Sequence, residues 1–159
     1  MMGDLKRGRT VRSLCYLLKN YYGVRLVFIA PEQFAMQPDV KAHLDEHRIP
    51  YHETTRLDEA LPSLDALYVT RMQTEWDTAG ESRSVDLSRF SIGAPQLARL
   101  KRDAIIMHPL PRGAEIDPAV DQDPRAMYWR QERNGMWMRA AVLAKIFGVE
   151  DRIPEIDAR

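Results

Sequence analysis

Apolar and polar positions along the chain predict helices and strands in alternation. Over residues 10–22 the apolar side chains recur at helical spacing, and Gly23 follows as a glycine does at a helix carboxyl end. Residues 24–30 are short, β-branched and aromatic and end before Pro31, which is typical of a buried strand. The pattern next predicts a polar-faced helix over residues 39–47, a short strand over 51–54 and a helical turn or two over 57–61. Residues 65–70 and 104–107 predict two further strands.

The remaining sequence predicts a long loop and a long helix. Residues 73–94 hold few strong apolar side chains, so we expect a long, mobile loop, and such loops are usually functional. Asp123 and Pro124 are residue types that open helices, and the apolar spacing after them predicts the longest helix, reaching Phe147. Five large side chains of this segment recur at helical spacing and predict core packing: Met127, Trp129, Met136, Trp137 and Met138.

This alternation predicts an α/β fold, a three-layer, doubly wound, mainly parallel sheet with helices on both faces, as in Rossmann-like proteins. Open sheets of this kind bind ligands outside the carboxyl ends of their strands. Three segments lie at such ends, residues 4–10, 70–73 and 108–112, and each carries arginine: Arg9, Arg71 and Arg112. Three guanidinium forks at one edge would suit a small ligand with two or more acidic groups. An arginine after a strand can equally cap a helix or pair with a surface carboxylate, and both interpretations stay open here.

Composition restricts the class of protein. The 159 residues match the size of one domain, and 45% apolar with 29% charged residues is the balance of a globular chain. A formal net charge of zero removes the electrostatic argument for a nucleic acid or an anionic membrane as partner. Apolar runs are too short to span a bilayer, and the amino terminus lacks the apolar segment of a secretion signal. With Cys15 as the single cysteine, we expect a cytoplasmic protein without disulfides, in which Cys15 is a core residue.

Two histidines have the spacing of metal ligands. His43 and His47 are four residues apart on a predicted helix. Glu46 adjoins the second histidine, so the segment is not the zinc-protease motif, and no third ligand is apparent from the sequence. The sequence therefore predicts neither a metal nor a cofactor.

Four sequence blocks together resemble one enzyme family. They are Gly-Asp-Leu-Lys-Arg-Gly-Arg-Thr-Val at 3–11, Tyr-Val-Thr-Arg-Met-Gln-Thr-Glu at 68–75, His-Pro-Leu-Pro-Arg at 108–112 and Asp-Gln-Asp-Pro-Arg-Ala at 121–126. They have the order and spacing found in aspartate carbamoyltransferase, and residues 128–144 resemble the last helix of that family. The resemblance covers nearly the whole chain but only the carboxyl-terminal, aspartate-binding half of the family's proteins.

The resemblance implies transfer of the carbamoyl group of carbamoyl phosphate to L-aspartate, giving N-carbamoyl-L-aspartate and phosphate in de novo pyrimidine biosynthesis. By motif, Arg9 would bind one aspartate carboxylate, and Arg71 with Gln73 would bind the side-chain carboxylate. Two forks at a fixed separation suit a dicarboxylate. Catalysis in this family needs no nucleophilic side chain, because the rate comes from positioning two substrates and stabilising the charge of a tetrahedral intermediate.

The resemblance also implies supporting roles. The main-chain carbonyls of Pro109 and Leu110 would face the carbamoyl amide, and Glu75 would orient Arg71. Residues that would support these groups from the same blocks are Thr10, His108 and Arg112.

The sequence departs from the family in several places. The Ser-Thr-Arg-Thr phosphate motif is absent together with the whole carbamoyl-phosphate domain, so residues 1–150 are read as an aspartate-binding domain and 151–159 as a tail. Only two residues precede Gly3, so we expect the first strand of the sheet to be missing. Arg12 stands where the family usually has histidine, and Thr74 and Trp76 replace a lysine and an arginine beside Glu75.

These departures shape the functional expectation. Family trimers form largely through the missing half, so we expect the chain alone to be inactive and not trimeric, with part of its final helix exposed. An ornithine carbamoyltransferase-like domain is the nearest rival, but His108-Pro109 and the Thr-Arg-Met-Gln block favour aspartate, because Arg71 would repel a cationic substrate. Two further interpretations stay open: a non-catalytic domain that binds an acidic metabolite or a partner protein, and a truncated product without a role.

Overall fold

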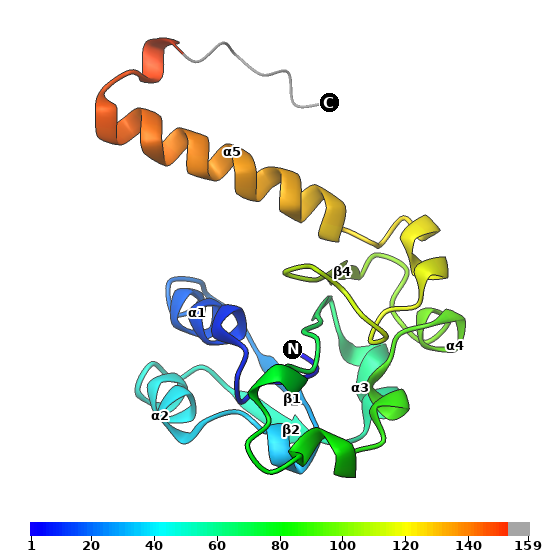
Figure 1. Cartoon of the computed structure of the whole chain (residues 1–159). Coiled ribbons are helices and arrows are strands. Elements are labelled where there is room, and N and C mark those ends of the chain that lie inside the picture. Colours follow the sequence, from blue (N-terminus) through cyan, green and yellow to red (C-terminus); the bar gives the residue numbers. More distant parts are fainter. Residues whose placement is uncertain (153–159) are drawn as a thin grey trace.

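Four short parallel strands form the centre of the computed structural model, which describes residues 1–152 (Figure 1). β1 (Leu26–Ile29) pairs with β2 (Tyr51–Thr54), and β3 (Ala66–Tyr68) pairs with β4 (Ile105–Met107). Met2 joins the two pairs through parallel bridges to Ile29 and Val69. Within residues 1–152 no strand precedes β1, and Met2 alone occupies the central position. Of the predicted tail at 151–159, residues 153–159 lie outside the described part.

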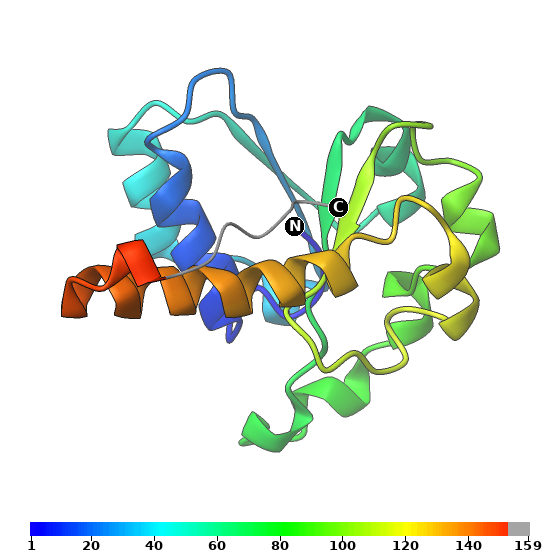
Figure 2. The ribbon, with the colours of Figure 1, turned by 90° about the horizontal axis from the view of Figure 1, so that it is seen from above.

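Helices flank the strands on two sides. α1 (Arg9–Leu18) and α2 (Pro38–Glu46) pack together on one side, whereas α3 (Leu57–Ala60) and α4 (Ala94–Leu97) lie on the other (Figures 1 and 2). The longest helix, α5 (Tyr128–Phe147), follows β4 and contacts it. Seven short 3-10 helices complete the described chain: η1 (Glu32–Phe34), η2 (Leu61–Ser63), η3 (Thr74–Trp76), η4 (Glu81–Ser84), η5 (Leu87–Phe90), η6 (Pro118–Gln122) and η7 (Glu150–Arg152).

Two hydrophobic clusters form the core. One packs α1 and α2 against β1 and includes Phe28 and Cys15, which is fully buried as predicted. The other surrounds β3 and β4 and includes Ile106 and the ring of Tyr128 at the start of α5. All four strands lie within the ranges that the sequence predicted, although β1, β3 and β4 are shorter than predicted.

α1 is shorter than its apolar pattern predicted. It ends at Leu18 rather than Tyr22, and the Asn20 and Tyr21 amides make tight-turn hydrogen bonds to Leu17 and Leu18. Tyr22 is fully exposed, and Gly23 takes a positive φ of 72° in the turn beyond the helix. The prediction of a helix to Tyr22 is wrong because Tyr21 and Tyr22 keep helical spacing without having a surface to pack against.

α5 begins at Tyr128, so the prediction that Asp123 and Pro124 open this helix is also wrong. Ile106 of β4 forms a parallel bridge with Ala126, accepting the Met127 amide and donating to the Arg125 carbonyl. Residues 123–126 form a turn that leads into this bridge, and the helix begins only after it, at Tyr128. The Asp123 carboxylate instead pairs with Arg125 at 2.8 Å.

The large apolar side chains of α5 face solvent rather than the core. Trp129 is 50% exposed, Trp137 43%, Met136 50% and Met138 65%, so the prediction of core packing is wrong for these four. The helix is held at its first turns and extends beyond the other elements (Figures 1 and 2). Among residues 1–152 every helix falls short of the length or the apolarity needed to cross a bilayer.

Candidate active site

Met2 lies between the two pairs of strands, which extend away from it in opposite directions. β1 and β2 lie to one side and β3 and β4 to the other. In open α/β folds the crevice at such a point, outside the carboxyl ends of the strands, is the ligand site. Gly3 allows the two flanking loops to meet there, since its φ is +111° and a Cβ would lie 2.0 Å from the Thr70 carbonyl oxygen.

Asp4 and Arg7 join the first loop to the loop after β3. The fully buried Asp4 carboxylate accepts the Arg7 amide at 3.0 Å and the Gln73 amide at 3.2 Å. Burial raises the pKa of Asp4, with those hydrogen bonds opposing it. The Arg7 guanidinium donates to the Gln73 carbonyl and to Asp77 Oδ1, both at 2.8 Å. The position of Gln73 is therefore fixed from the first loop.

Sequence reasoning assigned no role to Asp4 or Arg7. The one local signal is that an aspartate stands three residues before the amide it accepts, which is the spacing of a side-chain-capped turn. The contacts to Gln73 and Asp77 cross about 70 residues of sequence, so no local pattern could find them.

Arg71 emerges from the carboxyl end of β3 and pairs with Glu75 through both terminal nitrogens, one bond measuring 2.9 Å. Hydrogen bonds from Arg71 hold the pKa of Glu75 below its usual value. Glu75 engages two of the five guanidinium N–H groups, and the Arg71 side chain is 38% exposed. The Arg71 guanidinium is thus oriented by Glu75 while keeping donors for an incoming anion.

The loop after β4 is organised around His108, which is 1% exposed. Its Nδ1 accepts the Leu110 amide at 2.9 Å, so in the neutral ring Nε2 carries the proton that is shared with Glu115 Oε1 at 2.9 Å. Glu115 also accepts the Gly113 amide at 2.7 Å. Within residues 1–152 no hydrogen bond is made to the Pro109 or Leu110 carbonyl, so both oxygens are available to a ligand.

The charge of Glu115 in this loop acts on Arg71. The hydrogen bonds that Arg71 donates to Glu75 raise the pKa of Arg71, partial burial opposes them, and the charges of Glu75 and Glu115 add to the rise. Burial pushes the pKa of Glu115 up, but hydrogen bonds from His108 and the Gly113 amide outweigh it and leave the net pKa lowered. No sequence pattern singled out Glu115, because its partners depend on how the loop closes.

The other predicted site residues are not drawn into this arrangement. Arg9 and Thr10 are exposed at the start of α1 and line a shallow pocket on that helix with Leu14 and Leu17. Arg9 makes no ion pair with any residue of the described chain. Arg112 pairs with Asp121 at 2.5 Å and donates to the Ile116 carbonyl at 3.3 Å, which is the structural use of an arginine after a strand.

A possible metal-ligand group lies elsewhere, on α2. His43, Glu46 and His47 are the one group of three or more such residues in the described chain whose ligand atoms come within 4.8 Å of one another. Sequence reasoning found no third ligand there, and the structure supplies Glu46.

Comparison with known proteins places this geometry in a family. Residues 1–146 match the family model described as the Asp/Orn-binding domain of aspartate/ornithine carbamoyltransferase. The chain is 42% identical over 148 residues to the multifunctional protein CAD of Squalus acanthias, covering 93% of this chain and 7% of that protein. It is 39% identical over 150 residues to the aspartate carbamoyltransferase catalytic subunit of Clostridium acetobutylicum, covering 94% and 49%.

Solved structures agree. The aspartate transcarbamoylase catalytic subunit of M. jannaschii has a TM-score of 0.82 at 36% identity, covering 94% of this chain and 48% of that one. The Trypanosoma cruzi enzyme in complex with carbamoyl aspartate and phosphate has a TM-score of 0.79 at 39% identity, covering 89% and 46%. The chain spans about half the length of these catalytic subunits. This chain belongs to the aspartate/ornithine carbamoyltransferase family, in which it corresponds to the Asp/Orn-binding domain.

Proposed function

We propose that this chain is the aspartate-binding half of an aspartate carbamoyltransferase and acts with a carbamoyl-phosphate-binding half. The reaction would transfer the carbamoyl group to the L-aspartate amine, giving N-carbamoyl-L-aspartate and phosphate for pyrimidine synthesis. The observation that carries the proposal is the Arg71 guanidinium, which Glu75 orients at the carboxyl end of β3 beside the loop after β4.

Aspartate would bind through its two carboxylates. Arg71 and the Gln73 side chain would hold the side-chain carboxylate, and Arg9 would hold the other. The Asp4 and Arg7 contacts support this assignment, because they fix the backbone of Gln73 before substrate arrives. Preorganised donors lower the ordering cost of binding. Arg9 would swing from the first turn of α1 toward the substrate.

The loop after β4 would hold the carbamoyl group. The Pro109 and Leu110 carbonyls can accept hydrogen bonds from its amide nitrogen, and His108 and Arg112 fix the two ends of this loop. The attacking nitrogen belongs to aspartate, so the protein supplies position and charge. Cys15 takes no part, since it is buried and burial raises the pKa of its thiol to about 11.

We further infer the finer architecture from these elements. The four strands and Met2 would form one doubly wound parallel sheet in three layers, with helices on both faces and without a full first strand. Residues 1–150 would be the aspartate-binding domain. The homotrimer of the family would require the carbamoyl-phosphate half.

Transfer of labelled carbamoyl phosphate to aspartate tests the proposal. We would assay the full chain alone and mixed with a separately supplied carbamoyl-phosphate domain, expecting product only in the mixture. Arg71→Ala should lower the yield of N-carbamoyl-L-aspartate at least a hundredfold. Calorimetry should show no aspartate binding by this variant. Arg56→Ala is the matched control, because Arg56 also pairs with a nearby glutamate, Glu59, but both side chains are more exposed than those of Arg71 and Glu75 and neither belongs to the proposed site.

Different results would overturn the proposal. Turnover by the pure chain would contradict the need for a second half. Citrulline formed from ornithine would show that the substrate class is wrong. Aspartate binding without product in any mixture would favour a non-catalytic binding domain, and a folded chain without either property would have kept the family's shape without its chemistry.

A further inference from the structure

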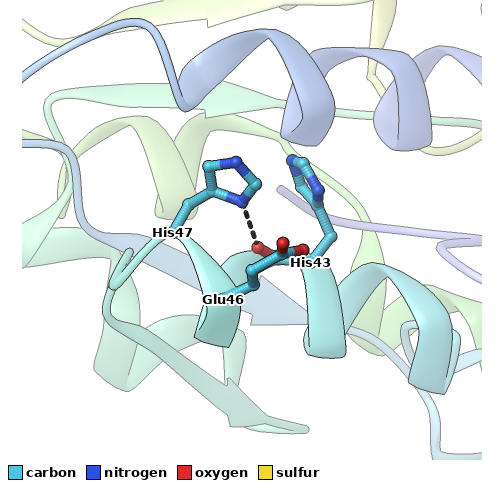
Figure 3. Close-up of side chains that lie close together, drawn as sticks. All are labelled: His43, Glu46 and His47. Atoms are coloured by element: carbon cyan, nitrogen blue, oxygen red, sulfur yellow. Dashed lines mark hydrogen bonds between the residues drawn. The ribbon is translucent and has the colours of Figure 1, made fainter.

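The carboxyl end of α2 brings three potential metal ligands together: His43 and Glu46 in its last turn, and His47 directly after it. His43, Glu46 and His47 have i, i+3, i+4 spacing, which places neighbours on the same side of a helix. Figure 3 shows both imidazole rings projecting to one side of α2 with the Glu46 carboxylate beside them. One ligand atom from each residue lies within 4.8 Å of the others.

His47 has the hydrogen bond that metal-binding histidines usually make. Its Nδ1 lies 2.9 Å from the His43 main-chain oxygen, which can only accept, so Nδ1 carries the proton. In the neutral ring, the lone pair is then on Nε2, directed away from the helix backbone. A backbone carbonyl that fixes the tautomer in this way is the usual second partner of a histidine bound to a metal.

His43 is held in place but incompletely satisfied. Its ring stacks on Tyr16 of α1 at 4.1 Å between centroids and lies 4.2 Å from the His47 ring. The Nε2 atom of His43 is shielded from solvent and has no hydrogen-bond partner among residues 1–152. Leaving a buried nitrogen without a partner is unfavourable, and a bound ligand would offset that cost.

We propose that His43, Glu46 and His47 bind a divalent cation of the Zn²⁺ class. Two imidazoles and one carboxylate are ligands for zinc and for neighbouring transition metals rather than for Mg²⁺ or Ca²⁺. Tetrahedral bonds of about 2.0–2.2 Å require the ligand atoms to approach by a further ~1 Å. The exposed side chains of Glu46 and His47 can rotate by that amount. The helix carboxyl end also favours a bound cation.

This site is independent of the proposed carbamoyl transfer. α2 runs from the carboxyl end of β1 back to the amino end of β2, so its last turn lies at the opposite edge from Arg71 and His108. Three protein ligands leave a position for water. Through the Tyr16 stack, a bound ion would also brace α1 against α2.

Zinc chloride titrated into the full chain, free of any polyhistidine tag, tests the site by calorimetry. We expect one Zn²⁺ per chain, a rise in melting temperature and a cobalt absorption spectrum with imidazole ligands. His47→Ala should weaken binding more than about a hundredfold and Glu46→Gln about tenfold. His52→Ala, an exposed histidine on β2, should bind zinc like the parent chain.

Aspartate binding in the same variants separates the two proposals. It should be unchanged in His47→Ala and Glu46→Gln, whatever the outcome for carbamoyl transfer. Equal zinc affinity in His47→Ala and the parent chain, or loss of zinc in His52→Ala, would overturn the metal site. Binding only at millimolar zinc would overturn it as well.

Discussion

The Nδ1 atom of His108 accepts the amide hydrogen of Leu110 at 2.9 Å, so a buried imidazole closes the turn that follows β4. The opposite ring nitrogen bonds to Glu115, whose Oε1 also accepts the Gly113 amide. One side-chain pair therefore determines the shape of the loop that carries the Pro109 and Leu110 carbonyls.

Acid should weaken the fold through Glu115. Its pKa is lower in the folded protein than in the unfolded chain, so its stabilising contribution is complete above the ordinary value of 4.5 and is lost as pH falls through the folded pKa. Glu115→Gln removes this contribution while keeping an oxygen that accepts both bonds. Urea midpoints from pH 7 to pH 3 should fall less steeply for the variant, and identical slopes would contradict the assignment.

Tyr128→Phe should lower the free energy of unfolding by about 1.5–3 kcal/mol, the range for a hydrogen bond to a charged partner. The buried Tyr128 hydroxyl donates to Asp121 Oδ1 at 2.5 Å, and Asp121 also pairs with Arg112. Chemical denaturation measures the change. Tyr22→Phe is the control, since Tyr22 is fully exposed and should have no effect; equal stability of both variants would show that the Asp121 contact contributes nothing.

Gly3→Ala should be much more damaging than Gly23→Ala, although both glycines have positive φ. Strain of this kind costs about 1–3 kcal/mol at either position. At Gly3 the new Cβ would also collide with the Thr70 carbonyl, whereas nothing lies within 4 Å of the Cβ at Gly23. Thermal melts compare the two, and a similar loss in both would mean that the loops do not approach as described.

The Cys15 thiol should be almost inert in the folded protein. Burial raises its pKa from 9.0 to about 11, which cuts the thiolate fraction near pH 8 by about a hundredfold, and the sulfur is shielded as well. A disulfide reagent such as DTNB should label it only after denaturation. Rapid labelling of the native chain would show that the cluster around Cys15 opens readily.

The sequence predicted the structural features that depend on residues close together along the chain. It missed the features that depend on contacts between distant residues. β1, β3 and β4 are local apolar runs, and Glu75 is four residues from the Arg71 that it orients. The start of α5 could not be predicted, since a bridge between Ile106 and Ala126 delays the helix. Apolar spacing also could not show whether another element covers the large apolar side chains of α5.

The same limit applies to the candidate site. The predicted strand ends were enough to single out Arg71 and Arg112. Only the folded chain shows that Arg112 already forms an ion pair with Asp121. Asp4 and Arg7 act on Gln73 across more than 60 residues. Contacts of that separation have no periodic signature in a single sequence.

The exposure of α5 has a consequence for how this protein moves. A 20-residue helix is about 30 Å long, and beyond its first residue only Ala144 is buried among its own side chains. Its far half is ordered mainly by its own backbone hydrogen bonds, and a helix supported in that way is marginal in water. Amide hydrogens near Phe147 should therefore exchange with solvent orders of magnitude faster than those beside Tyr128, so that one continuous helix spans both the rigid and the readily opened parts of the molecule.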